Sequence, residues 1–126
     1  MMRREQMKIY LAGPMRGYSN FNFEAFDYAT EWLRADGHEV FSPAEHDRAT
    51  YGPNVENNPT GDEHAAPPGC TINKCLLADT TWICRHAEAI ALLPGWEKSK
   101  GALAEKAVAE CLGLTIIILG KGYING

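Results

Sequence analysis

The sequence lacks any apolar run that approaches the roughly 18 consecutive residues needed for a membrane-spanning helix. Its first residues, 1–7, carry several charges and lack the apolar core of a secretory signal peptide. We therefore predict a cytoplasmic protein that does not associate with a membrane.

Basic charge is also scarce. The chain has 12 Lys and Arg against 16 Asp and Glu, which gives a formal net charge of −4. Binding a nucleic acid polymer requires clustered Lys and Arg that neutralise phosphates, so we expect no nucleic acid partner. The motifs Gly-x-x-x-x-Gly-Lys-Ser/Thr and Gly-x-Gly-x-x-Gly are absent as well, which disfavours a nucleoside triphosphatase and a dinucleotide-dependent dehydrogenase.

Cysteines are few, and a reducing compartment disfavours disulfides between them. The four are Cys70, Cys75, Cys84 and Cys111. Cys70 and Cys75, taken with His64, allow a reading as zinc ligands, but their spacing does not match a standard zinc knuckle. We expect neither a metal nor a cofactor.

The residues that are present predict one α/β domain over 1–126. A hydrophobic content of 45% in 126 residues is enough for one packed core and leaves no room for a second. Apolar segments predict strands at 8–12, 38–41, 89–93 and 115–119, and helical spacing predicts helices near 22–36, at 72–85 and around Glu105. Strands that alternate with helices imply a mostly parallel sheet with helices on both faces, a Rossmann- or flavodoxin-like three-layer sandwich.

Residues 42–71 interrupt this alternation. The segment contains five prolines, several Gly and Asn, and little periodicity. We predict a loop of about thirty residues, and loops of that length are commonly lids or binding loops.

Two carboxylates stand on apolar helical faces. The neighbours of Glu105 at helical spacing carry no charge: they are Gly101, Ala102, Val108, Ala109 and Leu112. Asp79 is placed in the same way among Cys75, Leu76, Trp82 and Ile83. A carboxylate on such a face is costly unless something uses it. In the structural alternative Glu105 pairs with a lysine or reaches water. In the functional one, the two acids serve displacement at a sugar carbon, one as nucleophile or oxocarbenium stabiliser and the other handling the leaving group's proton.

Two polar loops follow predicted strands and therefore fall at the carboxyl edge of the sheet, where such sheets bind ligands. In the loop 13–17, Arg16 lies between two glycines, so backbone N–H groups and a guanidinium can share one phosphate. In the loop 94–101, Ser99 and Gly101 open a helix whose N-terminus favours an anion. The structural alternatives are a solvated cation for Arg16 and a simple helix cap for Ser99.

Together these residues resemble the nucleoside 2-deoxyribosyltransferase superfamily, especially its nucleotide N-hydrolase branch and the related small domains common in phages. The segment Ile9-Tyr10-Leu11-Ala12-Gly13 is similar to the family's first strand, whose tyrosine contacts the catalytic carboxylate. The following loop is similar to the Gly-Ser-Ile-Arg-Gly phosphate loop of the hydrolases, although Pro14 replaces the serine. The resemblance therefore implies substrate binding by Gly13, Met15, Arg16 and Gly17.

The same resemblance assigns the acids. Asp79-Thr80-Thr81-Trp82-Ile83 is similar to the family's acid-bearing helix, and Ser99-x-Gly101-x-x-x-Glu105 is similar to the segment that ends in the nucleophilic glutamate. It implies catalysis by Glu105, Asp79 and Tyr10, with substrate binding by Ser99 and Gly101. Serine at position 99, where transferases of free nucleosides carry Asp, favours a nucleoside monophosphate. In the family a neighbouring subunit completes each site, which implies a homo-oligomer, dimeric or larger, with Tyr123 and Asn125 as the contributing residues.

We therefore expect an enzyme that cleaves the N-glycosidic bond of a (deoxy)nucleoside 5′-monophosphate through a glutamate nucleophile, with hydrolysis or base exchange as the outcome. A small-molecule nucleotide is the expected partner, and the sequence leaves the base open. Two alternatives remain: a binding module for a nucleotide or an ADP-ribose-type ligand without turnover, and an NAD glycohydrolase, which also uses a glutamate near a ribose.

Overall fold

Four short strands form one fully parallel sheet. The computed structural model describes residues 6–63, 66–67, 69 and 71–125. The strands are β1 (Lys8–Ala12), β2 (Glu39–Phe41), β3 (Ala89–Leu92) and β4 (Thr115–Ile118). Their order across the sheet is β2-β1-β3-β4, and every neighbouring pair is parallel. All four predicted strands are confirmed to within one residue at each end.

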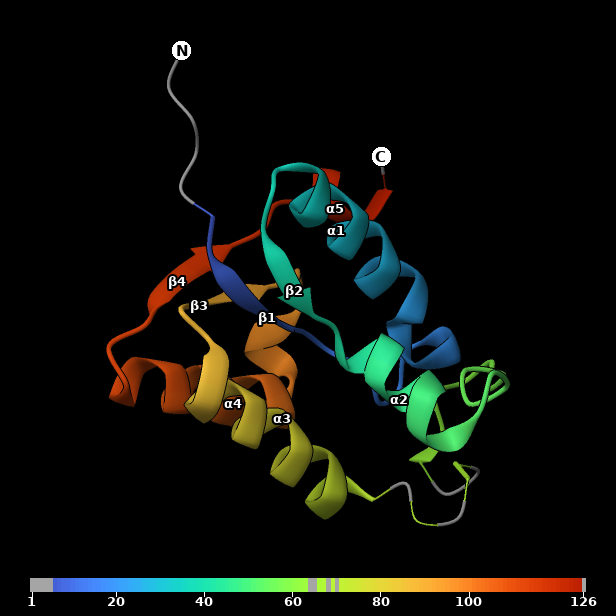
Figure 1. Ribbon diagram of the computed structural model, residues 1–126. Helices are drawn as coiled ribbons and strands as arrows, with labels where there is room; N and C mark the ends of the chain where they lie inside the picture. The colour runs from blue at the N-terminus through green and yellow to red at the C-terminus, as the bar shows by residue number, and fades with distance from the viewer. Residues whose placement is uncertain (1–5, 64–65, 68, 70, 126) are drawn as a thin grey trace.

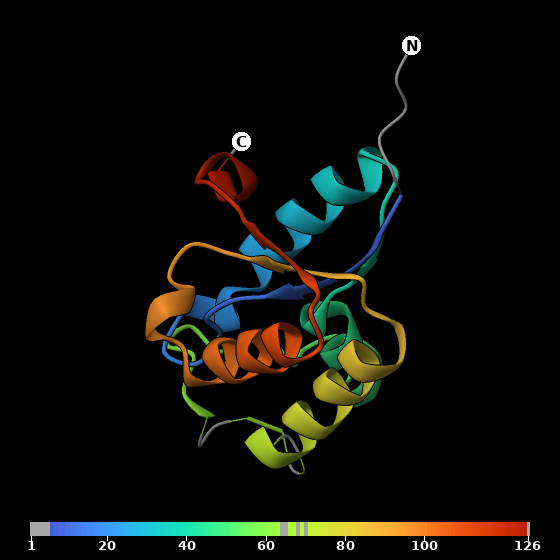
Figure 2. The same cartoon turned by 90° about the vertical axis from the view of Figure 1, so that its left-hand side faces the viewer.

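Helices cover both faces of this sheet. Helix α1 (Phe23–Ala35) and the short α5 (Gly122–Asn125) lie on one face, and α3 (Ile72–His86) and α4 (Lys100–Cys111) lie on the other (Figures 1 and 2). The predicted α/β three-layer sandwich is therefore confirmed. Strands β1 and β3 occupy the middle of the sheet, and from Ile9 onward all their residues are buried, as expected for strands covered on both faces.

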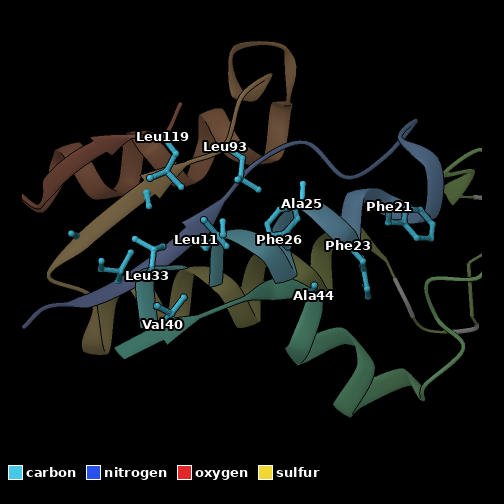
Figure 3. Close-up of a cluster of buried hydrophobic side chains, with 14 of the residues drawn as sticks. Leu11, Phe21, Phe23, Ala25, Phe26, Leu33, Val40, Ala44, Leu93 and Leu119 are labelled. Atoms are coloured by element: carbon cyan, nitrogen blue, oxygen red, sulfur yellow. The ribbon is translucent and has the colours of Figure 1, made fainter. Parts of the chain in front are cut away.

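The core is divided between the two faces by the alternation of side chains along each strand. Leu11 joins Phe26 and Leu33 in the cluster between the sheet and α1 (Figure 3). Tyr10 points the opposite way and packs with Ile90 of β3 in the cluster on the α3 and α4 side. The alternation thus places the phenol of Tyr10 in the layer that contains the two predicted acids.

The predicted loop 42–71 is wrong over its first third, where the chain forms helix α2 (Pro43–Tyr51). Proline has no N–H to lose and a suitable φ at the first helical position, so Pro43 starts this helix and does not break it. Ser42 occupies the N-cap position, and Gly52, at φ +103, ends the helix. The Ser42 hydroxyl is buried and finds no hydrogen-bond partner within the described part of the chain.

The strand order reverses between β1 and β3, and this point is where doubly wound sheets bind their ligands. The loops after β1 and β3 meet there: a Cβ placed on Gly95 would lie 2.7 Å from the hydroxyl of Tyr18 and 3.2 Å from the ring of Pro14. The two polar loops therefore adjoin, as predicted. Among the described residues, no helix has the length and apolarity needed to cross a membrane.

Candidate active site

Glu105 lies on the buried face of α4. Ser99 caps this helix by accepting a hydrogen bond from the backbone N–H of Ala102, and the inward face continues through Ala109. Only 6% of Glu105 is exposed. The hydroxyl of Tyr10 donates a hydrogen bond of 2.9 Å to Glu105 Oε2. The alternative of a lysine partner fails, because no ion pair to Glu105 is present among the described residues.

Asp79 meets Glu105 from the neighbouring helix. Thr71 caps α3, and this helix buries Asp79 and Ile83 on its inward face, where it packs against α4. Asp79 lies close enough to Glu105 and Tyr10 for both to act on the pKa of its carboxyl. Tyr10, Asp79 and Glu105 come from β1, α3 and α4 and thus form one buried polar cluster. We call this cluster the acid pair with its tyrosine.

Burial governs the protonation of this cluster. Removal from water raises the pKa of Glu105 well above its ordinary value, and the nearby charge of Asp79 raises it further. Burial also raises the pKa of Asp79, while Glu105, Tyr10 and the charge of His46 act in the opposite direction. Both carboxyls therefore hold a proton more strongly than free carboxyls do, Glu105 above all. Burial, followed by the charge of Glu105, raises the pKa of Tyr10, so its hydroxyl stays a hydrogen-bond donor.

Aromatic rings hold the tyrosine in place. The ring of Tyr10 stacks on Phe41 with centroids 5.6 Å apart, and Phe41 lies 5.1 Å from Trp82 and 5.5 Å from His46. These rings come from the first two strands, α3 and α2. These ring contacts restrict the orientation of the Tyr10 phenol, whose hydroxyl donates to Glu105.

A third carboxyl stands beside Asp79, and the sequence reasoning missed it. Asp47 of α2 is 9% exposed and lines, with Asp79 and Arg16, a cavity of about 50 Å³. The other lining residues are Met15, Phe21, Pro43, Val55, Glu63, Ala66 and Cys75. The space holds one or two waters. Burial and the charge of Asp79 raise the pKa of Asp47 to about 7, against the opposing charge of Arg16.

A sequence signal for Asp47 does exist. It lies three residues after Ala44 and four before Tyr51, so all three share one helical face, as Glu105 shares a face with alanines. That face is visible only once a helix is assigned to 43–51. Reading the prolines as loop markers concealed it.

The predicted phosphate loop 13–17 is present, but other parts of the chain occupy its donors. Arg16 Nε donates to Glu63 Oε2 at 2.7 Å. The backbone N–H of Gly17 donates to the carbonyl oxygen of Gly61 at 2.9 Å. Gly61 and Glu63 therefore accept hydrogen bonds from this loop in the way that a phosphate would.

The remaining residues of that loop serve packing. A Cβ on Gly13 would lie 2.8 Å from Cβ of Leu93, so glycine permits the close approach of the loops after β1 and β3. Met15 packs against the core and lines the cavity. The structure thus brings Met15 and Arg16 beside Asp79.

Ser99 and Gly101 mark the start of α4. The Ser99 side chain is a helix cap, as its structural alternative predicts. Around Gly101, an added Cβ would meet nothing within 4 Å. Neither residue belongs to the described lining of the cavity beside Asp79.

Tyr123 and Asn125 are the residues proposed to act from a neighbouring subunit. Tyr123 packs against the core cluster on the α1 side, on the opposite face of the sheet from the acid pair. The side chain of Asn125 lies outside the described part of the structure.

Two of the residues named for a zinc site, His64 and Cys70, also lie outside the described residues. Cys75 lines the cavity beside Asp79. Within the described ranges, no group of three or more His, Cys, Asp or Glu side chains is placed to hold a metal ion.

Comparison with known proteins identifies a family but no activity. No curated protein matches the chain. No solved structure matches it either. The model of one family, described as a domain of unknown function, DUF4406, matches residues 7–118, which covers the sheet, the acid pair and Asp47. The chain therefore belongs to the DUF4406 family.

Proposed function

We propose that this protein cleaves the N-glycosidic bond of a (deoxy)nucleoside 5′-monophosphate through Glu105, with hydrolysis or base exchange as the outcome. The observation that carries this proposal is the buried acid pair with its tyrosine. Two carboxyls that share one proton supply both a nucleophile and an acid, which is what displacement at a sugar carbon requires.

The proposed reaction begins with a transfer of the proton that the two carboxyls share. When the base binds, the shared proton passes from Glu105 to Asp79, which leaves Glu105 ionised. The Glu105 carboxylate then forms a bond to C1′ as the C1′–N bond breaks, and the base nitrogen takes the bonding electrons and the proton from Asp79. A water molecule next attacks C1′ and gives its proton to Asp79 while Glu105 departs. If a second base attacks in place of water, the product is a new nucleotide.

Tyr10 and the loop 13–17 support this chemistry. The phenol of Tyr10, which donates to Glu105, stabilises the ionised nucleophile. The substrate phosphate would contact Arg16 and the N–H of Gly17 after it displaces Glu63 and the Gly61 carbonyl. The resemblance to nucleotide N-hydrolases favours the same assignment.

A homo-oligomer belongs to the same proposal, with Tyr123 or Asn125 of one subunit completing the site of another. Sedimentation velocity of the purified chain tests this point. A monomer at assay concentrations with full activity would remove it and leave the chemistry intact.

The test is release of free base from each deoxy- and ribonucleoside monophosphate and from NAD, followed by chromatography with and without an acceptor base. Glu105→Gln is the inactive variant. Glu110→Gln, at an exposed position on the same helix, is the matched control. We expect release from at least one monophosphate by the wild type and the control and none by Glu105→Gln. Full activity of Glu105→Gln would refute the proposal.

A binding module without turnover is the second candidate. Either function requires Gly61 and Glu63 to release the phosphate donors, and the cavity is far smaller than the roughly 300 Å³ of a typical ligand pocket. Calorimetric titration with the same nucleotides separates the two functions, because a binding module takes up a ligand tightly and releases no base.

A further inference from the structure

Asp47 is a buried carboxyl that the proposed reaction does not use. It is 9% exposed, and no hydrogen bond to its side chain occurs within the described part of the chain. It faces the same small cavity as Asp79, together with Arg16 and Glu63. Burial disfavours the ionised form of this carboxyl, so the fold retains it at a price in stability that a ligand contact would offset.

The cavity accepts the polar edge of a ligand. About 50 Å³ has room for one or two waters or an amino group, so the cavity takes the polar edge of a base and not the whole base. An ionised carboxylate only accepts hydrogen bonds, whereas a carboxylic acid also donates one. An amino group therefore pairs with either form of Asp47. A carbonyl oxygen pairs only with the protonated form.

We propose that Asp47 is a specificity-determining residue that selects substrates whose base carries an exocyclic amino group, such as cytosine or adenine, over the matching oxo bases uracil and hypoxanthine. This inference rests on the proposed function, because it assumes that a nucleotide base reaches Asp79.

The charges around Asp47 make this preference depend on pH. Arg16, Glu63 and Asp79 face it across the cavity, and His46 of its own helix acts on Asp79. Burial raises the pKa of Asp47 to about 7, so the carboxyl is largely ionised at pH 8.5 and largely protonated at pH 6. The oxo bases gain a donor only at the lower pH, and discrimination against them falls there.

The experiment measures binding by calorimetry to Glu105→Gln, which leaves the nucleotide intact. dCMP is compared with dUMP, and dAMP with dIMP, at pH 6 and pH 8.5. We expect the amino member of each pair to bind about 10- to 100-fold more tightly at pH 8.5, since hydrogen bonds to charged groups are worth that much, and the ratio to shrink at pH 6. Adding Asp47→Asn, whose amide donates to a carbonyl, should bring the ratio within about threefold at both pH values. Glu45→Gln, at an exposed position on the same helix, is the control.

The outcomes separate the two proposals. Equal binding of both members of each pair at both pH values overturns the role of Asp47 and leaves the proposed function standing. Absence of binding and of base release for every nucleotide overturns the proposed function, and this inference with it. If Asp47→Asn does not fold, the wild-type ratio of kcat/KM within each pair decides: a ratio that does not change between pH 6 and pH 8.5 overturns the inference.

Discussion

Two acidic hollows in the described part of the chain differ in how their charges are satisfied. The larger is an open groove of about 640 Å³ beside α1, lined by Tyr18, Ser19, Asn20, Asn22, Glu24, Asp27, Tyr28, Glu31 and Glu56. The smaller is the cavity of about 50 Å³ between Asp47 and Asp79. In the groove, Arg48 pairs with Asp27 at 2.7 Å and with Glu56 at 2.6 Å, and all three side chains are partly exposed.

The larger hollow is the weaker candidate for a reaction centre. Arg48 also lies 4.9 Å from the ring centroid of Phe23, so it joins Asp27 and Glu56 to the core and gives these two acids a structural role. Asp79 and Glu105 form no ion pair among the described residues, and burial raises the pKa of both carboxyls. Carboxyls kept buried and unneutralised are typical of a reaction centre.

The largest expected effect comes from exchanging Glu105, which adjoins Asp79 in the acid pair, and from comparing it with the exchange of one acid of the groove. Glu105→Gln should lower the rate of base release by about a thousandfold or more, because it removes the nucleophile. Glu31→Gln, in the groove, should leave the rate within about twofold. Single-turnover assays with each variant at substrate saturation measure both. A comparable loss in the two variants would show that the groove takes part in the reaction.

The second effect is on stability and concerns Asp47. Its pKa is raised to about 7 by burial, so between about pH 4 and pH 7 the folded chain binds a proton that the unfolded chain releases. The free energy of unfolding therefore falls as pH rises through this window and levels off above it. Asp47→Asn removes the cost and should stabilise the protein by roughly 2–4 kcal/mol at pH 8, and by less at pH 5.

Urea unfolding at the two pH values measures this difference. Glu45→Gln, which loses only the exposed pair with Arg34, should shift stability by less than about 1 kcal/mol at either pH. An equal gain from Asp47→Asn at pH 5 and pH 8 would mean that Asp47 is not protonated in the folded state.

A smaller effect separates the two tyrosine environments. Tyr10→Phe keeps the stacked ring but removes the hydrogen bond to Glu105, so the pKa of Glu105 should rise further and the rate should fall by about 10- to 100-fold. Tyr28→Phe, in the groove, should change nothing measurable. The pH dependence of kcat for both variants tests this, since a purely structural role for Tyr10 would leave the profile unmoved.

Sequence reasoning succeeded where periodicity was strong. Strands β1 and β3 are continuous apolar runs, and α1, α3 and α4 repeat their apolar residues at helical spacing, so the layers and the parallel sheet followed. The same periodicity placed Glu105 and Asp79 on buried faces. The sequence could not predict that these two side chains lie close together, because that depends on how α3 packs against α4.

The sequence prediction was wrong where one residue type is typical of two different structures. Pro43 starts α2, although proline within a polar segment also marks loops. Without α2 neither the face of Asp47 nor the cavity beside Asp79 could be predicted. The pairing of Arg16 with Glu63 was equally hidden, because 47 residues separate them and only the folded segment brings them together.

The smallest expected effect concerns that pair. Glu63→Gln removes the charge that holds Arg16, whose side chain is 33% exposed, so the guanidinium becomes available to a phosphate. Exposed ion pairs are weak, and we expect the Kd for a nucleoside monophosphate to fall by only about two- to fivefold. Glu56→Gln, which breaks a pair of Arg48 in the groove, should leave it unchanged. Calorimetric titration on the Glu105→Gln background measures both, and a weaker affinity after Glu63→Gln would indicate that Glu63 helps to form the phosphate site instead of competing for it.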